Sequence, residues 1–164
     1  MKKKLILLVL SIFLITGCDF IKIDSMEDIS IITTNYSIEY IIRSLYGDHS
    51  IVTSIYPDDT DTYNYVLNDK ALTNYAKKDL FVYLSYGGDK DIAVNLLKKN
   101  NDLLIIDASL GMKPDYLEEL WLNPSNMLMI AHNIRNGLKE FMDNTYLEKN
   151  IDDNYEKLKL LLSE

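Results

Sequence analysis

The chain has 164 residues, of which 48% are hydrophobic, and its formal net charge is −8 at pH 7. This length is enough for one domain with its own hydrophobic core. The excess of acidic groups argues against binding to nucleic acid or, through the folded part, to an anionic lipid surface, and is compatible with cationic ligands or simply with solubility.

The first residues predict that the chain is exported. Three lysines at positions 2–4 precede a run of twelve largely apolar residues from Leu5 to Thr16. A membrane-spanning helix needs about 20 apolar residues, so this run is too short for a permanent anchor and is typical of a signal peptide, residues 1–17. Its removal takes away three lysines and no acidic residue, which changes the formal net charge from −8 to −11.

The signal peptide ends in a motif, Ile15-Thr16-Gly17-Cys18, that resembles the bacterial lipobox. We expect the mature chain to begin at Cys18, with diacylglycerol on its sulfur and palmitate-like acyl chains that anchor it at the outer face of the cell membrane. Cys18 is the only cysteine, so no intramolecular disulfide can form. The alternative is an ordinary signal peptide with a chance cysteine. Residues 18–28 are then a lipidated tether.

From residue 29 the chain alternates between apolar strands and helices. The expected strands are residues 29–33, 50–55, 80–84 and 103–106. Between them, apolar side chains three and four residues apart predict helices. The clearest such set is Ile38, Ile41, Ile42 and Leu45. Gly47 is suited to end this helix, and Asp69 and Asp89 are expected to cap the next two.

This alternation predicts an α/β lobe, residues 29–123, in which helices flank a four-stranded parallel sheet. In open sheets of this kind ligands bind beyond the carboxyl ends of the strands. The segments expected at this edge are residues 34–36, 58–65, 86–88 and 107–109. They are rich in polar side chains and form a coherent candidate site.

Residues 124–164 have a different pattern, which predicts a long connector helix and a terminal helix. The apolar stripe of the first helix comprises Met127, Ile130, Ala131, Ile134, Leu138 and Phe141. That of the second comprises Ile151, Tyr155, Leu158 and Leu162. No further strand is expected after them.

Four segments carry a resemblance to a known family. They are IITTNYSIEYIIRSLYGDHSIVTSIYP, KKDLFVYLSYGGD, LLIIDASLG and LWLNPSN. Over residues 29–162 the chain resembles the N-terminal lobe of the metal-binding lipoproteins that serve zinc and manganese ABC importers. The resemblance implies two α/β lobes joined by a long helix, with the ion between them and an ABC permease as partner. We expect the second lobe to be absent from this chain.

The chain departs from the family at the expected metal ligands. The family usually places one histidine in the loop after the second strand and another two residues before the tryptophan of its WL-x-P motif. Tyr63 and Glu119 occupy these positions here. The resemblance therefore implies a degenerate site for zinc or manganese, made by Asp61, Tyr63 and Glu119. A tyrosine binds metal well only as a phenolate, and its reference pKa is about 10. A solvated acidic loop, including Asp58 and Asp59, is the alternative.

The two histidines are not expected to replace these ligands. His49 precedes the second strand, away from the carboxyl edge, and His132 lies off the apolar stripe of the long helix. Trp121 is expected to anchor packing. No nucleophile elbow, P-loop or dinucleotide fingerprint is present, and no carboxylate pair is singled out, so neither catalysis nor a bound cofactor is expected.

The sequence therefore predicts a membrane-anchored lipoprotein that resembles the solute-binding component of a metal-ion ABC importer. One lobe cannot enclose an ion, so uptake would require a separately encoded second lobe or a homodimer. The alternatives are a non-transport lipoprotein that acts as a partner-binding or adhesin-like module, and a truncated product without function.

Overall fold

The computed structural model describes residues 29–47, 50–57, 60–62, 64–113, 119–142 and 144–163. The expected signal peptide and tether, with Cys18, lie outside the described residues, as does His49. Within the described ranges, no helix combines the length and the apolar character needed to cross a bilayer.

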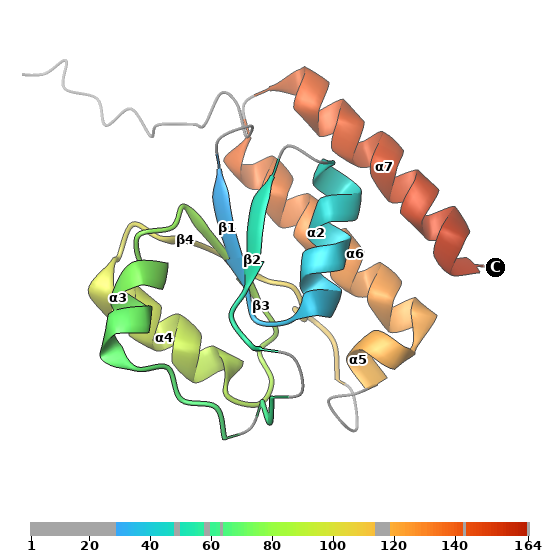
Figure 1. The fold of residues 1–164 in the computed structure, drawn as a ribbon. Coiled ribbons are helices and arrows are strands. Elements are labelled where there is room, and N and C mark those ends of the chain that lie inside the picture. The colour runs from blue at the N-terminus through green and yellow to red at the C-terminus, as the bar shows by residue number, and fades with distance from the viewer. Residues whose placement is uncertain are drawn as a thin grey trace, which may run out of the picture.

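The structure confirms the predicted four-stranded parallel sheet (Figure 1). Its strands are β1 (Ser30–Thr33), β2 (Ile51–Ser54), β3 (Leu80–Tyr83) and β4 (Leu104–Asp107). All neighbours are parallel, in the order β2-β1-β3-β4. In this register Ile32 lies opposite Thr53 on one side and Phe81 on the other.

Six helices are described. They are α2 (Tyr36–Tyr46), α3 (Asp69–Tyr75), α4 (Asp89–Lys99), α5 (Glu119–Leu122), α6 (Pro124–Phe141) and α7 (Thr145–Ser163). The predicted long connector helix and terminal helix are α6 and α7, and α5 is a single turn before them.

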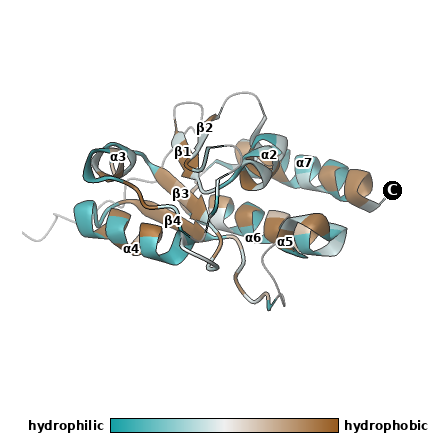
Figure 2. Ribbon diagram, turned by 60° about the horizontal axis from the view of Figure 1, so that its bottom comes forward, coloured by the Kyte–Doolittle hydropathy of each residue, from teal (hydrophilic) through white to brown (hydrophobic). Residues whose placement is uncertain are grey.

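The sheet separates two hydrophobic cores, because successive side chains of a strand point to opposite faces. Ile31 and Val82 belong to the core under α2, α6 and α7, whereas Ile32 and Phe81 belong to the core under α3 and α4. The helices turn their hydrophobic faces towards the sheet and their hydrophilic faces outwards (Figure 2). The result is a layered α/β/α arrangement in which α7 lies outside α2 and α6 (Figure 1).

The predicted apolar stripes of α6 and α7 are confirmed. The fully covered members are Ile130, Ala131, Ile134, Leu138, Ile151 and Leu158, and the remaining members pack against the same core while half-buried. Trp121 also packs against this core, as expected for an anchoring side chain.

Asparagine side chains cap four of the described helices. Asn35, Asn68, Asn123 and Asn144 each accept a hydrogen bond from a backbone N–H in the first turn of α2, α3, α6 and α7, respectively. The prediction that Asp69 caps α3 is wrong, because Asp69 is the first helical residue and Asn68 before it makes the capping bond. Gly47, with a φ of 80°, ends α2 as predicted, and its N–H donates to the carbonyl of Arg43.

Candidate functional site

The carboxyl ends of the strands lie together at one edge of the sheet, the lower edge in Figure 1. The strand order changes direction between β1 and β3, because the chain passes from β1 to β2 on one side and then returns to β3 and β4 on the other. Such a switch point is where open parallel sheets bind ligands. The loop after β2 and the turn before α4 both lie at this edge (Figure 1).

A buried tyrosine–aspartate pair lies at the switch point. Tyr56 is 8% exposed and Asp89 is 5% exposed. The Tyr56 hydroxyl donates to Asp89 Oδ1 at 2.5 Å, and the backbone N–H of Leu84 lies 3.4 Å from Asp89 Oδ2. Burial raises the pKa of Asp89, although polar contacts with Thr34, Tyr56 and the Leu84 amide oppose this effect. The same burial, together with Asp89, raises the pKa of Tyr56.

This geometry corrects the expectation for Asp89. The residue in the N-cap position of α4 is Gly88, which makes no side-chain capping bond, and Asp89 is the first helical residue. Its carboxylate turns into the protein instead of capping its own helix. The pattern Gly-Gly-Asp before a helix favours a cap, and nothing in it points to a partner 33 residues away.

The loop after β2 carries Asp61, the only expected ligand of this loop that lies among the described residues. Asp61 is exposed, and its Oδ2 accepts a hydrogen bond from the Asn64 side chain at 2.7 Å. The loop is closed by a contact of Tyr65 with Tyr56, whose ring centroids are 5.2 Å apart in an edge-to-face arrangement. Tyr63, Asp58 and Asp59 lie outside the described residues.

Glu119, the other described ligand expected from the resemblance, is the first residue of α5. It is half-buried, and its carbonyl accepts a hydrogen bond from the Asn126 side chain at 3.0 Å. Helix α5 lies at the same edge of the sheet as the loop of Asp61 (Figure 1). Among the described residues, however, no group of three or more His, Cys, Asp or Glu side chains is placed to hold a metal ion.

The polar residues at the carboxyl ends of β3 and β4 form hydrogen bonds with one another. Asp107 accepts hydrogen bonds from the Ser85 hydroxyl at 2.5 Å and from the Ser109 hydroxyl at 2.8 Å. The Ser109 hydroxyl in turn accepts a bond from the backbone N–H of Ser85 at 2.8 Å. This network joins the ends of β3 and β4, so these groups shape the edge of the site.

A hollow of about 240 Å³ lies behind the loop, between α3 and α4. Tyr65, Leu72, Asp91 and Asn95 are among its lining residues. Its wall includes Gly88, so it adjoins the buried pair at the switch point.

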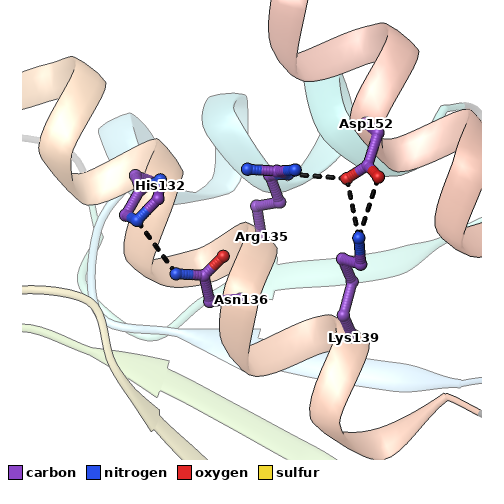
Figure 3. A network of polar contacts seen from close by, with 5 residues as sticks. All are labelled: His132, Arg135, Asn136, Lys139 and Asp152. Carbon is purple, nitrogen blue, oxygen red and sulfur yellow. Dashed lines mark hydrogen bonds and ion pairs between the residues drawn. The ribbon is translucent and has the colours of Figure 1, made fainter.

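His132 belongs to a separate polar network on the other face of the sheet (Figure 3). It is exposed on α6, as predicted, and shares a 3.0 Å hydrogen bond with Asn136. Nearby, Asp152 of α7 accepts bonds from Arg135 at 2.6 Å and Lys139 at 2.8 Å. These bonds fasten α7 to α6.

The charge state of Asp152 follows from this network. The hydrogen bond from Arg135 lowers the pKa of Asp152, with Lys139 acting in the same direction and partial burial opposing it. The folded state therefore favours the carboxylate. The stabilising contribution is fully present above the pKa of this carboxyl group in the unfolded chain, about 3.9. It is lost as the pH falls from there through the lower pKa of Asp152 in the folded state.

Known proteins resemble this chain in both sequence and fold. Residues 31–164 match the family described as ZnuA, zinc-uptake complex component A, periplasmic. Among solved structures, the zinc-bound ZnuA-like domain of AdcA from Streptococcus pneumoniae is 20% identical, with a TM-score of 0.71 over 82% of this chain and 52% of that chain. No curated protein gave a match.

Two further solved structures share the fold. The metal-dependent lipoprotein YcdH from Bacillus subtilis is 20% identical, with a TM-score of 0.68 over 82% of this chain and 52% of that chain. The laminin-binding protein Lbp of Streptococcus pyogenes is 20% identical, with a TM-score of 0.67 over the same shares. The chain thus spans about half the length of these relatives.

Proposed function

Because the chain belongs to the ZnuA family of periplasmic zinc-uptake components, we propose that it binds a zinc or manganese ion for delivery to an ABC permease. The family consists of substrate-binding proteins and is not an enzyme family. The observation that carries the proposal is the family match over residues 31–164, which includes every described strand and helix from α2 to α7 apart from the first residue of β1. The polar loops at the carboxyl edge of the sheet support it, since this edge is where such sheets bind ligands.

In this proposal the lobe supplies one wall of the ion site. Asp61 and Glu119 offer carboxylate oxygens from two segments at the same edge of the sheet, and Tyr63, two residues after Asp61 in the sequence, is the third ligand of the proposal. Oxygen ligands suit harder ions such as Mn²⁺ better than they suit Zn²⁺, which binds imidazole and thiolate well. The other wall comes from a second lobe, in a longer form of this chain, in a separate chain or in a second copy. A site of this composition is weak and poorly selective.

We also propose that the mature chain is anchored to the membrane through acylated Cys18. The lipobox-like tetrad supports this anchor, and the YcdH relative is itself described as a lipoprotein. In bacteria that express the full chain, intact-mass analysis of the membrane fraction should find a product that begins at Cys18 and carries added acyl mass. The Cys18→Ser chain should lose this mass and leave the membrane. A native product without acyl mass would contradict the anchor.

Metal binding is tested with a soluble domain, residues 18–164 carrying Cys18→Ser. Titration calorimetry should give a dissociation constant on the order of 10 µM for Mn²⁺ or Zn²⁺, which corresponds to about −7 kcal/mol. We expect Glu119→Ala to weaken binding by about fivefold, or about 1 kcal/mol. Glu140→Ala, which removes an exposed carboxylate from α6, is the matched control and should leave the affinity unchanged.

Two results of this titration would contradict the proposed site. One is the absence of binding at micromolar concentrations, and the other is binding that Glu119→Ala leaves unchanged. The second candidate function is an adhesin-like module, which the laminin-binding relative Lbp favours. A soluble domain that binds neither ion but is retained on a laminin-coated surface would support that candidate.

A further inference from the structure

The buried carboxylate of Asp89 is the most unusual polar group at the carboxyl edge. An ionised carboxylate that is 5% exposed is costly unless other groups compensate for the lost water. Asp89 is compensated by the Tyr56 hydroxyl at 2.5 Å, by the Leu84 amide at 3.4 Å, by its polar contact with Thr34 and by its position in the first turn of α4, where the helix dipole favours a negative charge. Its partners come from the ends of β2 and β3, so it joins separate parts of the edge.

The backbone of Tyr56, its main partner, is hydrogen-bonded to the end of β1. The backbone N–H of Ile55 donates to the Thr33 carbonyl at 2.8 Å, and that of Tyr56 donates to the Thr34 carbonyl at 3.0 Å. These two bonds continue the pairing of β1 with β2 beyond the last residue of β2. These bonds fix the backbone position of Tyr56 relative to the sheet, and its side chain extends from there to Asp89, the first residue of α4.

The loop that carries Asp61 rests on this pair at two places. At its far end, the Tyr65 ring packs edge-to-face on the Tyr56 ring. In its middle, the carbonyl of Thr62 approaches Gly88 so closely that a Cβ there would lie 3.3 Å from that oxygen and 3.9 Å from the Tyr56 hydroxyl. A side chain at position 88 would therefore require the Thr62 carbonyl to move away by a few tenths of an ångström.

We propose that Tyr56 and Asp89 are positioning residues, which hold the loop of Asp61 against the start of α4 and so fix its ligand atoms at the carboxyl edge. The expected effect of these residues on metal affinity rests on the proposed function. Their expected effect on the position of the loop depends only on the fold. Groups that orient metal ligands without touching the ion typically contribute about 10- to 100-fold to affinity.

The first test measures hydrogen exchange of the soluble domain. Tyr56→Phe keeps the ring and its contact with Tyr65 but removes the hydroxyl, so the Asn64 amide, which donates to the Asp61 carbonyl at 3.3 Å, should exchange at least about tenfold faster. Asp89→Ala should have a similar effect. Asp89→Asn should restore much of the protection, because its amide oxygen can still accept the Tyr56 hydrogen bond.

The control is Asp152→Asn, which weakens the fastening of α7 to α6 on the other face of the sheet. It should accelerate exchange in α7 and leave the exchange of the Asn64 amide unchanged. The proposal is overturned if Tyr56→Phe and Asp89→Ala leave exchange in the loop unchanged, or accelerate it only as much as in α6 and α7. Should Asp89→Ala fail to fold, Tyr56→Phe alone still decides between these results.

The second test is titration of the same variants with Mn²⁺ and Zn²⁺. If the unsubstituted domain binds metal, Tyr56→Phe should weaken binding by about tenfold and Asp89→Asn by less. Loop exchange that accelerates with no change in affinity would overturn the positioning of the ligands. If the unsubstituted domain binds neither ion, the proposed function fails, and the exchange measurement alone decides whether the pair holds the loop.

Discussion

Replacing both Tyr63 and Glu119 by histidine is expected to raise the affinity of the soluble domain for Zn²⁺ by about 100-fold, or about 2.7 kcal/mol. In the proposed site these two positions correspond to the histidines that the resemblance to the family implies. A neutral imidazole is ready to bind Zn²⁺ near pH 7, whereas a phenol must first lose a proton with a reference pKa of about 10. Titration calorimetry in zinc-free buffer measures the change, and Co²⁺ absorption reports whether the ion becomes tetrahedrally coordinated.

The two single variants decide whether both positions serve one ion. If they do, each single histidine should add little, and the double variant should gain more than the sum of the two. The matched control places histidines at Lys70 on α3 and Lys157 on α7, which are exposed and lie on opposite sides of the sheet. An equal gain in this control, or additive gains from the single variants, would contradict a shared site at the carboxyl edge.

The periodicity of apolar residues was sufficient to predict the sheet and its layers. Strands such as LFVY have apolar side chains on both faces, and the structure buries all four of these residues. A strand covered on both sides by helices requires this pattern. The spacing of Ile130, Ile134 and Leu138 likewise identified the buried side of α6, because residues three and four apart share a helix face. Each of these patterns is local, and the tertiary fold agrees with it.

The sequence could predict the edge of the site but not its interior. It placed Asp107 and Ser109 at the carboxyl edge, but their hydrogen bonds with Ser85 depend on the pairing of β3 with β4. It assigned Asp89 to a helix cap, and the structure turns this carboxylate towards Tyr56. Both contacts join residues that are more than 20 positions apart, so no pattern within one element reveals them.

Gly137 is another residue whose importance appears only in three dimensions. In the middle of a helix a glycine is usually a weakness, since alanine is favoured there by about 1 kcal/mol. In the folded chain a Cβ on Gly137 would lie 2.7 Å from Cγ1, 2.8 Å from Cδ1 and 3.0 Å from Cγ2 of Ile106. Ile106 is buried in β4, so helix α6 lies directly against the sheet at Gly137, with no room for a side chain between them.

Gly137→Ala is therefore expected to destabilise the soluble domain, reversing the usual sign of this substitution. Overpacking a core typically costs about 1–3 kcal/mol, which exceeds the gain in helix propensity and leaves a net loss of about 1–2 kcal/mol. Gly137→Leu, which adds a much larger side chain, should cost about 3 kcal/mol or more. Equilibrium unfolding in urea, with the slope of the transition monitored, measures both changes.

The role of Ile106 decides whether close packing is the cause. Ile106 carries two γ carbons on its Cβ. A rotation about χ1 that moves one of them away from position 137 therefore leaves the other close to it. Ile106→Ala alone should cost about 2–5 kcal/mol through the cavity that it leaves. Combined with Gly137→Ala it should cost less than the sum of the two, because the new methyl group enters that cavity. Additive losses, or a Gly137→Ala variant as stable as the unsubstituted domain, would show that α6 can move away from β4 without penalty.

Glu140→Ala, an exposed substitution three residues further along α6, should change the free energy of unfolding by less than about 0.5 kcal/mol. This control separates packing at position 137 from the general effect of alanine in this helix.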